Sequence, residues 1–137
     1  MGNRRKAREQ ALQVLYLIDS TGMAADAALD LFRTNFESHE EDFDFVSELV
    51  RGVLTHLAEL DALIEKHAEN WKLSRMPRID RNILRLGAFQ LLHRDDIPPA
   101  VTLDESVELG KRFGEEKTPA YVNGVLDRIF RERPNRV

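Results

Sequence analysis

The stretch RIDRNILRLGAFQLLH, residues 78–93, decides how this chain folds. Apolar residues dominate it and recur at helical spacing, which is the pattern of a helix covered by neighbours over most of its surface. Pro77 stands directly before the stretch and fits the first turn of a helix, where its missing N–H costs nothing. The sequence therefore predicts a central helix that ends at about His93, with the other elements arranged around it.

Three segments upstream have the periodicity of helices with one buried stripe, at about residues 3–19, 25–35 and 38–67. In the third segment, Ser38 and Glu41 have the spacing of a capping box, and the apolar pattern behind them continues without a break. We therefore predict that this third segment forms the longest helix of the chain.

Two more helices are predicted downstream, after a break at residues 95–99 that contains two prolines. Thr102 and Glu105 have the spacing of a second capping box, and the helix that they open is expected to stop at Gly114. The Thr-Pro pair at residues 118–119 is predicted to be the N-cap and first residue of the last helix.

No segment alternates apolar and polar residues in the way that a strand does. We therefore predict an all-α fold of six to seven helices. A length of 137 residues favours a single domain, residues 1–137. Within it, an N-terminal bundle of about residues 3–68 is expected to pack on a C-terminal bundle of about residues 71–133.

Charge is distributed unevenly along the chain, although the net charge is only -4. Residues 1–25 carry four cations and two acids, residues 26–70 carry three cations and twelve acids, and residues 71–94 carry six cations and one acid. Such segregation allows one face of the protein to attract phosphate while another repels it.

Several kinds of site and location are disfavoured by composition. Cysteine is absent, which excludes disulfides and thiolate metal sites and fits a reducing cytoplasm. No apolar stretch reaches the length of about 18 residues that a membrane helix needs. The four histidines lack the spacing of a helical zinc site, and neither a phosphate-binding glycine loop nor a nucleophile elbow occurs. We expect a soluble cytoplasmic protein that is not an enzyme and binds no metal or cofactor.

The segment RRKARE, residues 4–9, is the strongest candidate for ligand binding. It lies on the first turns of an amphipathic helix, and its four cations are Arg4, Arg5, Lys6 and Arg8. Guanidinium groups bind phosphate bidentately and stack on unpaired bases, which favours single-stranded RNA. The alternative is a solvated helix start, although cations there oppose the helix dipole. Tyr16 lies on roughly the same side and either stacks on a base or packs in the core.

Two further pairs call for an explanation. Asn123 and Gly124 interrupt an otherwise helical pattern, so we expect structural roles for both: a bond from the Asn123 amide to a neighbouring element, and a close backbone approach at Gly124. Arg81 and Arg85 are one turn apart and either form internal ion pairs, with Asp80 or residues 104–108 as partners, or face another protein.

Four blocks in order resemble bacterial transcription antitermination factors of the NusB family: RRKAREQALQVLY (4–16), RIDRNILRLGAFQL (78–91), TLDESVELGKRFG (102–114) and YVNGVLDRI (121–129). The resemblance implies two packed three-helix bundles. It also implies a heterodimer with NusE, a small-subunit ribosomal protein, that binds boxA RNA of nascent ribosomal RNA transcripts. In the elongation complex with other Nus factors, this pair makes RNA polymerase resistant to termination.

The resemblance assigns RNA contacts to the basic helix start and to the start of the last helix, namely Arg4, Arg5, Lys6, Arg8, Tyr16, Lys117 and Tyr121. It assigns NusE contacts to the central helix and the next one, namely Asp80, Arg85, Gln90 and Glu105. Lys117 stands where some relatives carry an acid, Tyr121 replaces the common phenylalanine, and Gln90 stands where glutamate is usual.

Two alternatives remain open from the sequence. One is the RNA-binding domain of a ribosomal RNA methyltransferase, in which NusB-like domains also occur. The other is a homodimeric helical scaffold that binds only protein and buries its basic helix at the self-interface.

Overall fold

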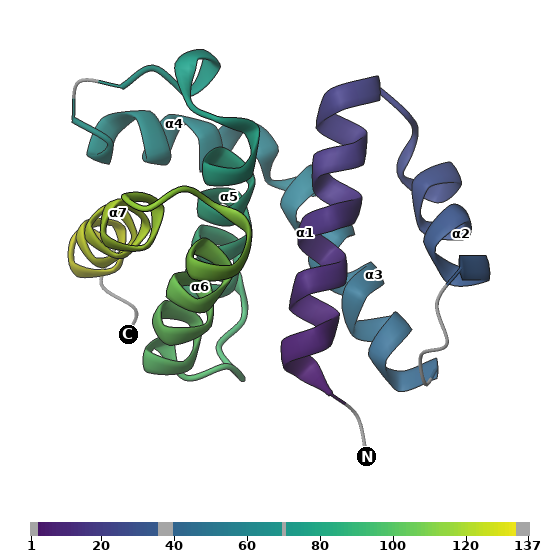
Figure 1. The fold of residues 1–137 in the computed structure, drawn as a ribbon. Coiled ribbons are helices and arrows are strands. Elements are labelled where there is room, and N and C mark those ends of the chain that lie inside the picture. Colours follow the sequence, from purple (N-terminus) through teal and green to yellow (C-terminus); the bar gives the residue numbers. More distant parts are fainter. Residues whose placement is uncertain (1–2, 36–39, 70, 134–137) are drawn as a thin grey trace.

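The structure of the chain is a computed structural model that describes residues 3–35, 40–69 and 71–133 (Figure 1). These residues form seven α-helices and one short 3-10 helix, and no strand occurs among them: α1 Arg4–Thr21, α2 Ala25–Asn35, α3 Glu40–Thr55, α4 Leu57–His67, η1 Leu73–Arg75, α5 Arg78–His93, α6 Pro99–Phe113 and α7 Thr118–Glu132. The predicted all-α fold is confirmed. None of the described helices is long and apolar enough to cross a membrane.

Helix α5 is central, as predicted. In Figure 1, α1, α2 and α3 lie on one side of it, and α4, α6 and α7 lie on the other. It contacts α1, α3, α4, α6 and α7, and eleven of its 16 residues are buried. A helix in contact with five others has almost no free surface, which explains why its sequence is apolar on so many sides.

The predicted long helix over residues 38–67 is in fact two helices, so this prediction was wrong. The chain turns at His56, and α4 then packs mainly against α5 and α7 rather than against the first two helices. The helical period continues through the turn because each part buries an apolar face, although against different neighbours. The longest described helix is α1, with 18 residues. Of the predicted capping box, Ser38 lies outside the described residues.

Both downstream helices begin differently from the prediction. Helix α6 begins at Pro99, so Thr102 is not its cap but a buried residue of its first turn. Proline supports this earlier start because its φ angle already suits a helix and it needs no hydrogen-bond acceptor. Thr118 is the first residue of α7 rather than the residue before it, and its hydroxyl accepts the N–H of Glu115 at 3.0 Å.

The ends of α1 are fixed by local hydrogen bonds. The Asn3 side chain accepts the N–H of Lys6 at 3.1 Å, which satisfies one of the free donors of the first turn. At the other end, Gly22 adopts a φ of 74° and donates its N–H to Ile18. A positive φ favours glycine, so the helix stops there. The bond at Asn3 fixes the first turn, which carries the basic residues.

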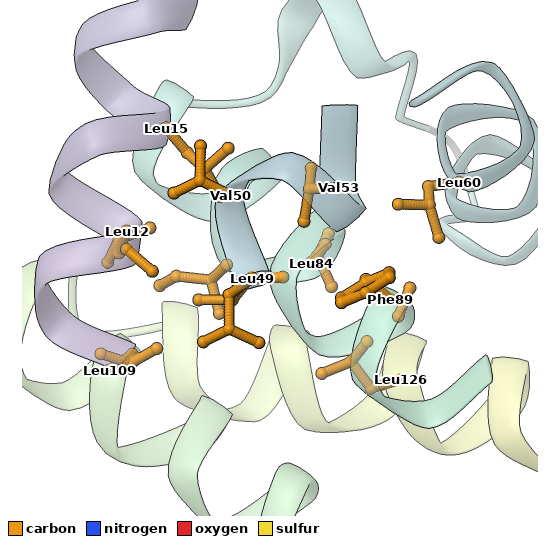
Figure 2. Close-up of a cluster of buried hydrophobic side chains, with 14 of the residues drawn as sticks. Leu12, Leu15, Leu49, Val50, Val53, Leu60, Leu84, Phe89, Leu109 and Leu126 are labelled. Atoms are coloured by element: carbon orange, nitrogen blue, oxygen red, sulfur yellow. The ribbon is translucent and has the colours of Figure 1, made fainter. Parts of the chain in front are cut away.

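One hydrophobic cluster joins the two halves of the protein. Figure 2 shows Leu12 and Leu15 of α1 near side chains from the other helices. The labelled partners come from α3, α4, α5, α6 and α7: Leu49, Val50, Val53, Leu60, Leu84, Phe89, Leu109 and Leu126. Because apolar residues of α1 and α7 share one cluster, the bundles are parts of a single core.

Glycines at two positions have opposite roles. A Cβ at Gly52 would lie 2.0 Å from the Phe89 ring, so glycine is what lets α5 approach α3. A Cβ at Gly124 would meet only the Arg128 guanidinium, at 3.6 Å, so the predicted close backbone approach is absent there. Asn123 is exposed and its side chain bonds to no described residue, so the prediction that its amide bonds to a neighbouring element was wrong. It lies on the outer face of α7, while Val122 on the inner face is buried.

We expect Gly52→Ala to lower the free energy of unfolding by about 1 to 3 kcal/mol, because the methyl group overpacks the core against Phe89. Gly124→Ala should instead raise it by about 1 kcal/mol, because alanine is the better helix former and space is available. Urea unfolding of both variants measures the two effects. Two changes of the same sign would contradict this description of the α3–α5 contact.

Candidate nucleic-acid interface

Polar contacts fix α1 on α5 near both ends of α1. The Asp19 carboxylate accepts hydrogen bonds from Arg81 at 2.6 and 2.7 Å and from Asn82 at 2.9 Å. Near the start of α1, the Nε of Arg8 donates to the Oε1 of Gln90 at 2.9 Å. Because the end of α1 meets the start of α5 and the reverse, the two helices run antiparallel.

The charge of Asp19 is held by its partners. Burial acts to raise the pKa of its carboxyl, but the hydrogen bonds from Arg81 and Asn82 and the charges of Arg81 and Arg85 outweigh burial. The pKa is therefore lowered from its usual value of 3.8. Asp19 remains ionised in the folded protein and attaches α1 to α5 as an anion.

Arg8 and Gln90 are not on the surface, contrary to prediction. Their exposed fractions are only 4% and 2%. Burial lowers the pKa of Arg8, although a guanidinium stays charged in proteins. The sequence held a signal for this position, because Arg8 lies three, four and seven residues before buried Ala11, Leu12 and Leu15. Arg8 belongs to the buried stripe of α1 and supports the site from within.

Three of the four predicted RNA-binding cations of α1 are exposed. Lys6 forms no ion pair with any described residue, and the guanidinium of Arg4 lies 4.3 Å from the centre of the Phe45 ring. A cation over an aromatic face is attracted by the ring, so Arg4 is held in place while remaining accessible. The start of α1 thus presents cations from a fixed position.

Arg5 forms an ion pair with Glu105 of α6. The sequence analysis predicted an RNA contact for Arg5 and a NusE contact for Glu105, so the two predicted sites meet at this pair. The distances are 3.1 Å from Nε to Oε2 and 3.2 Å from Nη2 to Oε1. The Arg5 side chain is 63% exposed and that of Glu105 only 17%. This hydrogen bond is the main reason why the pKa of Arg5 is raised. A second pair, Arg112 with Glu9 at 3.3 Å, joins the same two helices.

Asp80 is buried, so the prediction of an exposed carboxylate facing a partner protein was wrong. It is 8% exposed, and the Thr118 hydroxyl donates a hydrogen bond to it at 3.1 Å. Burial raises the pKa of Asp80. The sequence places an acid in the first turn of α5, but it cannot show that the start of α7 covers it.

Arg85 is also engaged inside the protein. Its guanidinium pairs with Asp61 at 2.8 and 3.0 Å and with Asp19 at 3.4 Å. Internal ion pairing, the alternative to an interface, is therefore what the structure shows for Arg81 and Arg85. Their partners are Asp19 and Asp61, not the acids of α5 and α6 that the sequence offered as candidates.

The last two predicted RNA residues, Lys117 and Tyr121, lie at a pocket of about 280 Å³ at the starts of α5 and α7. Lys117 is exposed and Tyr121 is half-buried. The pocket is also lined by Trp71, which the sequence analysis missed. Its signal was a lone tryptophan in a segment without helical period. Tyr16, on α1, is 40% exposed, so it is not a core residue.

His56, Glu59 and His93 come together although their spacing predicts no metal site. Their ligand atoms lie within 4.8 Å of one another. The two imidazole rings are stacked, with 3.8 Å between centroids and 14° between planes, and His93 Nε2 lies 2.6 Å from Glu59 Oε1. A ring nitrogen binds a metal in the plane of its ring, so two nearly parallel rings do not converge on one ion. The cluster is a hydrogen-bonded stack in this arrangement.

Helices packed around α5, with fixed cations at the start of α1, make this a small all-α protein whose surface suits an anionic ligand. Residues 5–131 match the sequence model of the NusB family, and the chain belongs to that family. It is therefore a transcription antitermination factor and not an enzyme.

Relatives and solved structures agree with this assignment. The transcription antitermination protein NusB of Myxococcus xanthus is 51% identical over 133 residues, covering 94% of this chain and 95% of the relative. A T. maritima NusB structure superimposes with a TM-score of 0.88 at 33% identity, covering 96% of this chain and 94% of that one. A chain from a crystal structure of antitermination factors NusB and NusE in complex with dsRNA superimposes with a TM-score of 0.84 at 30% identity. The match covers 93% of this chain and 96% of that one.

Asp80→Asn tests the burial of this carboxyl. A carboxyl whose folded pKa is raised makes the folded state less stable as pH rises from the unfolded pKa of 3.8 through the folded value. The variant keeps an acceptor for Thr118 but cannot ionise, so its melting temperature at pH 7 should equal or exceed that of the natural chain. The difference should vanish below about pH 4.

Asp19→Asn is the matched control with the opposite sign, because the pKa of Asp19 is lowered. Its contribution is present above pH 3.8 and disappears as pH falls through the lower folded value. At neutral pH, the free energy of unfolding of the variant should be about 1.5 to 3 kcal/mol lower than that of the natural chain. Melting temperatures measured across a range of pH report both effects. If the difference from the natural chain changed with pH in the same direction for both variants, the opposite pKa shifts of Asp80 and Asp19 would be contradicted.

Proposed function

We propose that this chain binds boxA RNA of nascent ribosomal RNA transcripts as a heterodimer with NusE, and that the complex makes RNA polymerase resistant to termination. The observation that carries the proposal is the 30% identical chain, with a TM-score of 0.84, from the structure of NusB and NusE in complex with dsRNA. Other Nus factors would join the pair in the elongation complex.

The exposed cations at the start of α1 supply the RNA contacts in this proposal. Arg4 and Lys6 are accessible, and the cap at Asn3 fixes the turn that carries them. Arg5 contributes without leaving Glu105, because that carboxylate occupies only its Nε and Nη2. A guanidinium has five donors, so its Nη1 remains for a phosphate oxygen.

A path for a single strand leads from these cations to the pocket at Lys117 and Tyr121. The ion pairs of Arg5 with Glu105 and of Glu9 with Arg112 show that α1 and α6 run side by side in the same direction. From Glu105 to the end of α6, eight residues on, the rise is roughly 12 Å. RNA bound along this seam would therefore reach the start of α7.

The NusE surface is proposed to include Glu105. Asp80 and Gln90 are buried and Arg85 is engaged by Asp19 and Asp61, so these three act from beneath the surface. Glu105 keeps partial exposure at the edge of α6. A basic group of NusE would share this carboxylate with Arg5, which would bring the RNA and NusE to the same edge of α6.

We place the protein in the cytoplasm, where nascent transcripts are made in bacteria, and propose no membrane contact. Self-association through the basic helix is the competing arrangement. Size measurement with and without boxA RNA separates the two, because RNA and a second copy would compete for the same cations.

The double variant Arg4→Gln, Lys6→Gln should weaken RNA binding by the complex with NusE and flatten its salt dependence. Each phosphate contact on a single strand contributes about -0.7 to the slope of log affinity against log salt. Fluorescence anisotropy with labelled boxA RNA at several salt concentrations measures the slope. Arg51→Gln, Lys66→Gln is the charge-matched control, because both residues are exposed on other helices, and it should leave the slope unchanged. An unaltered slope in the first variant would place the RNA elsewhere.

A further inference from the structure

The pocket beside Tyr121 combines apolar and polar lining residues. The apolar ones are Trp71, Met76 and Pro77, and the polar ones are Asp80, Glu115, Lys117, Thr118 and Tyr121. Its volume of about 280 Å³ is at the small end of ligand sites, which span about 300 to 1,000 Å³. Such a space suits a single flat ring better than an extended ligand.

Two polar groups in this pocket lack full partners. The Tyr121 hydroxyl is buried and has no hydrogen-bond partner among the described residues. Asp80 receives the Thr118 hydroxyl at Oδ1, and within the described ranges no hydrogen bond reaches its Oδ2. A donor and an acceptor left open in a buried place are groups that a ligand can satisfy.

Trp71 is the aromatic platform of the pocket. It is the only tryptophan of the chain, and its side chain is 50% exposed. The segment that carries it is held to α4, because the Trp71 N–H bonds to Ala68 and the Leu73 N–H bonds to Glu65. Trp71 is therefore a half-exposed aromatic residue at the same pocket as the exposed cation Lys117.

We propose that this pocket takes one unpaired base of the bound RNA, which stacks on Trp71 and places an amino edge against Asp80 and Tyr121. The inference rests on the proposed RNA-binding function and names the ligand group of one subsite. Aromatic stacking holds any base, and Lys117 at the rim is positioned to meet the adjoining phosphate.

The polar residues of the pocket add a preference among bases. An ionised Asp80 only accepts hydrogen bonds, so it matches the exocyclic amine of adenine, cytosine or guanine. Uracil has no exocyclic amine, and the two carbonyl oxygens that flank its single ring N–H carry partial negative charge, which the carboxylate repels. The pocket is therefore selective against uracil, and Asp80 is the residue that determines this.

Because Trp71 is the single tryptophan, its fluorescence reports on the pocket directly. We would titrate the complex with NusE using boxA-like RNA, and then the same RNA with an abasic nucleotide at each position in turn. Intact RNA should change the Trp71 emission. One abasic position should abolish that change and weaken binding by about 5- to 150-fold.

Variants complete the test. Trp71→Ala should weaken binding of the intact RNA by a similar factor but have no further effect on RNA that is abasic at that position. Trp71→Phe should retain most of the affinity, and Leu31→Ala, which removes another exposed apolar side chain, should retain all of it. Asp80→Asn should remove the discrimination against uracil at that position.

The outcomes separate this inference from the function on which it rests. RNA binding with unchanged Trp71 emission and no effect of Trp71→Ala would overturn the pocket and leave the RNA-binding proposal standing. A fluorescence change caused by NusE alone, with none on adding RNA, would assign the pocket to the protein partner and overturn the inference. No RNA binding by the natural chain with NusE would overturn both.

Discussion

The attachment of α1 to α5 is the constraint on which the rest of the structure depends. Burial of Leu12 and Leu15 drives the two helices together, but hydrophobic contact has no direction and does not fix their register. Hydrogen bonds do: Asp19 meets Arg81 at one end, and Arg8 meets Gln90 at the other. Removing one partner would leave a buried charge or amide unsatisfied, so alternative registers are strongly disfavoured.

The cations near this attachment fall into a buried group and an exposed group. Arg8, Arg81 and Arg85 are held inside by amide or carboxylate groups and give α1 its position. Arg4, Arg5 and Lys6 remain exposed at the start of α1. The proposed RNA-binding surface needs few exposed cations, because their backbone is already held in place. The modest net charge of the chain is consistent with such a surface.

Helix α5 also fixes the position of the start of α7. Its first turn supplies Asp80, which is hydrogen-bonded to Thr118 of α7, and Trp71 lines the same pocket. The proposed interface has two parts, the start of α1 and the start of α7. Contacts with the same buried helix, α5, fix the position of both. Helix α6 connects them through its ion pairs with Arg5 and Glu9.

The sequence by itself determined the all-α fold, the central position of residues 78–93, the approximate extent of α1 and the family of the protein, because each of these is recorded in local periodicity or contiguous motifs. It also placed cations at the start of α1. Only the tertiary structure decided that Arg8 turns inward while Arg4 stays exposed, that Asp80 is covered, and that the chain bends at His56. Periodicity records that a face is buried but not which neighbour buries it. Contacts such as that between Arg8 and Gln90 join residues far apart in the chain, so they exist only once the helices have packed.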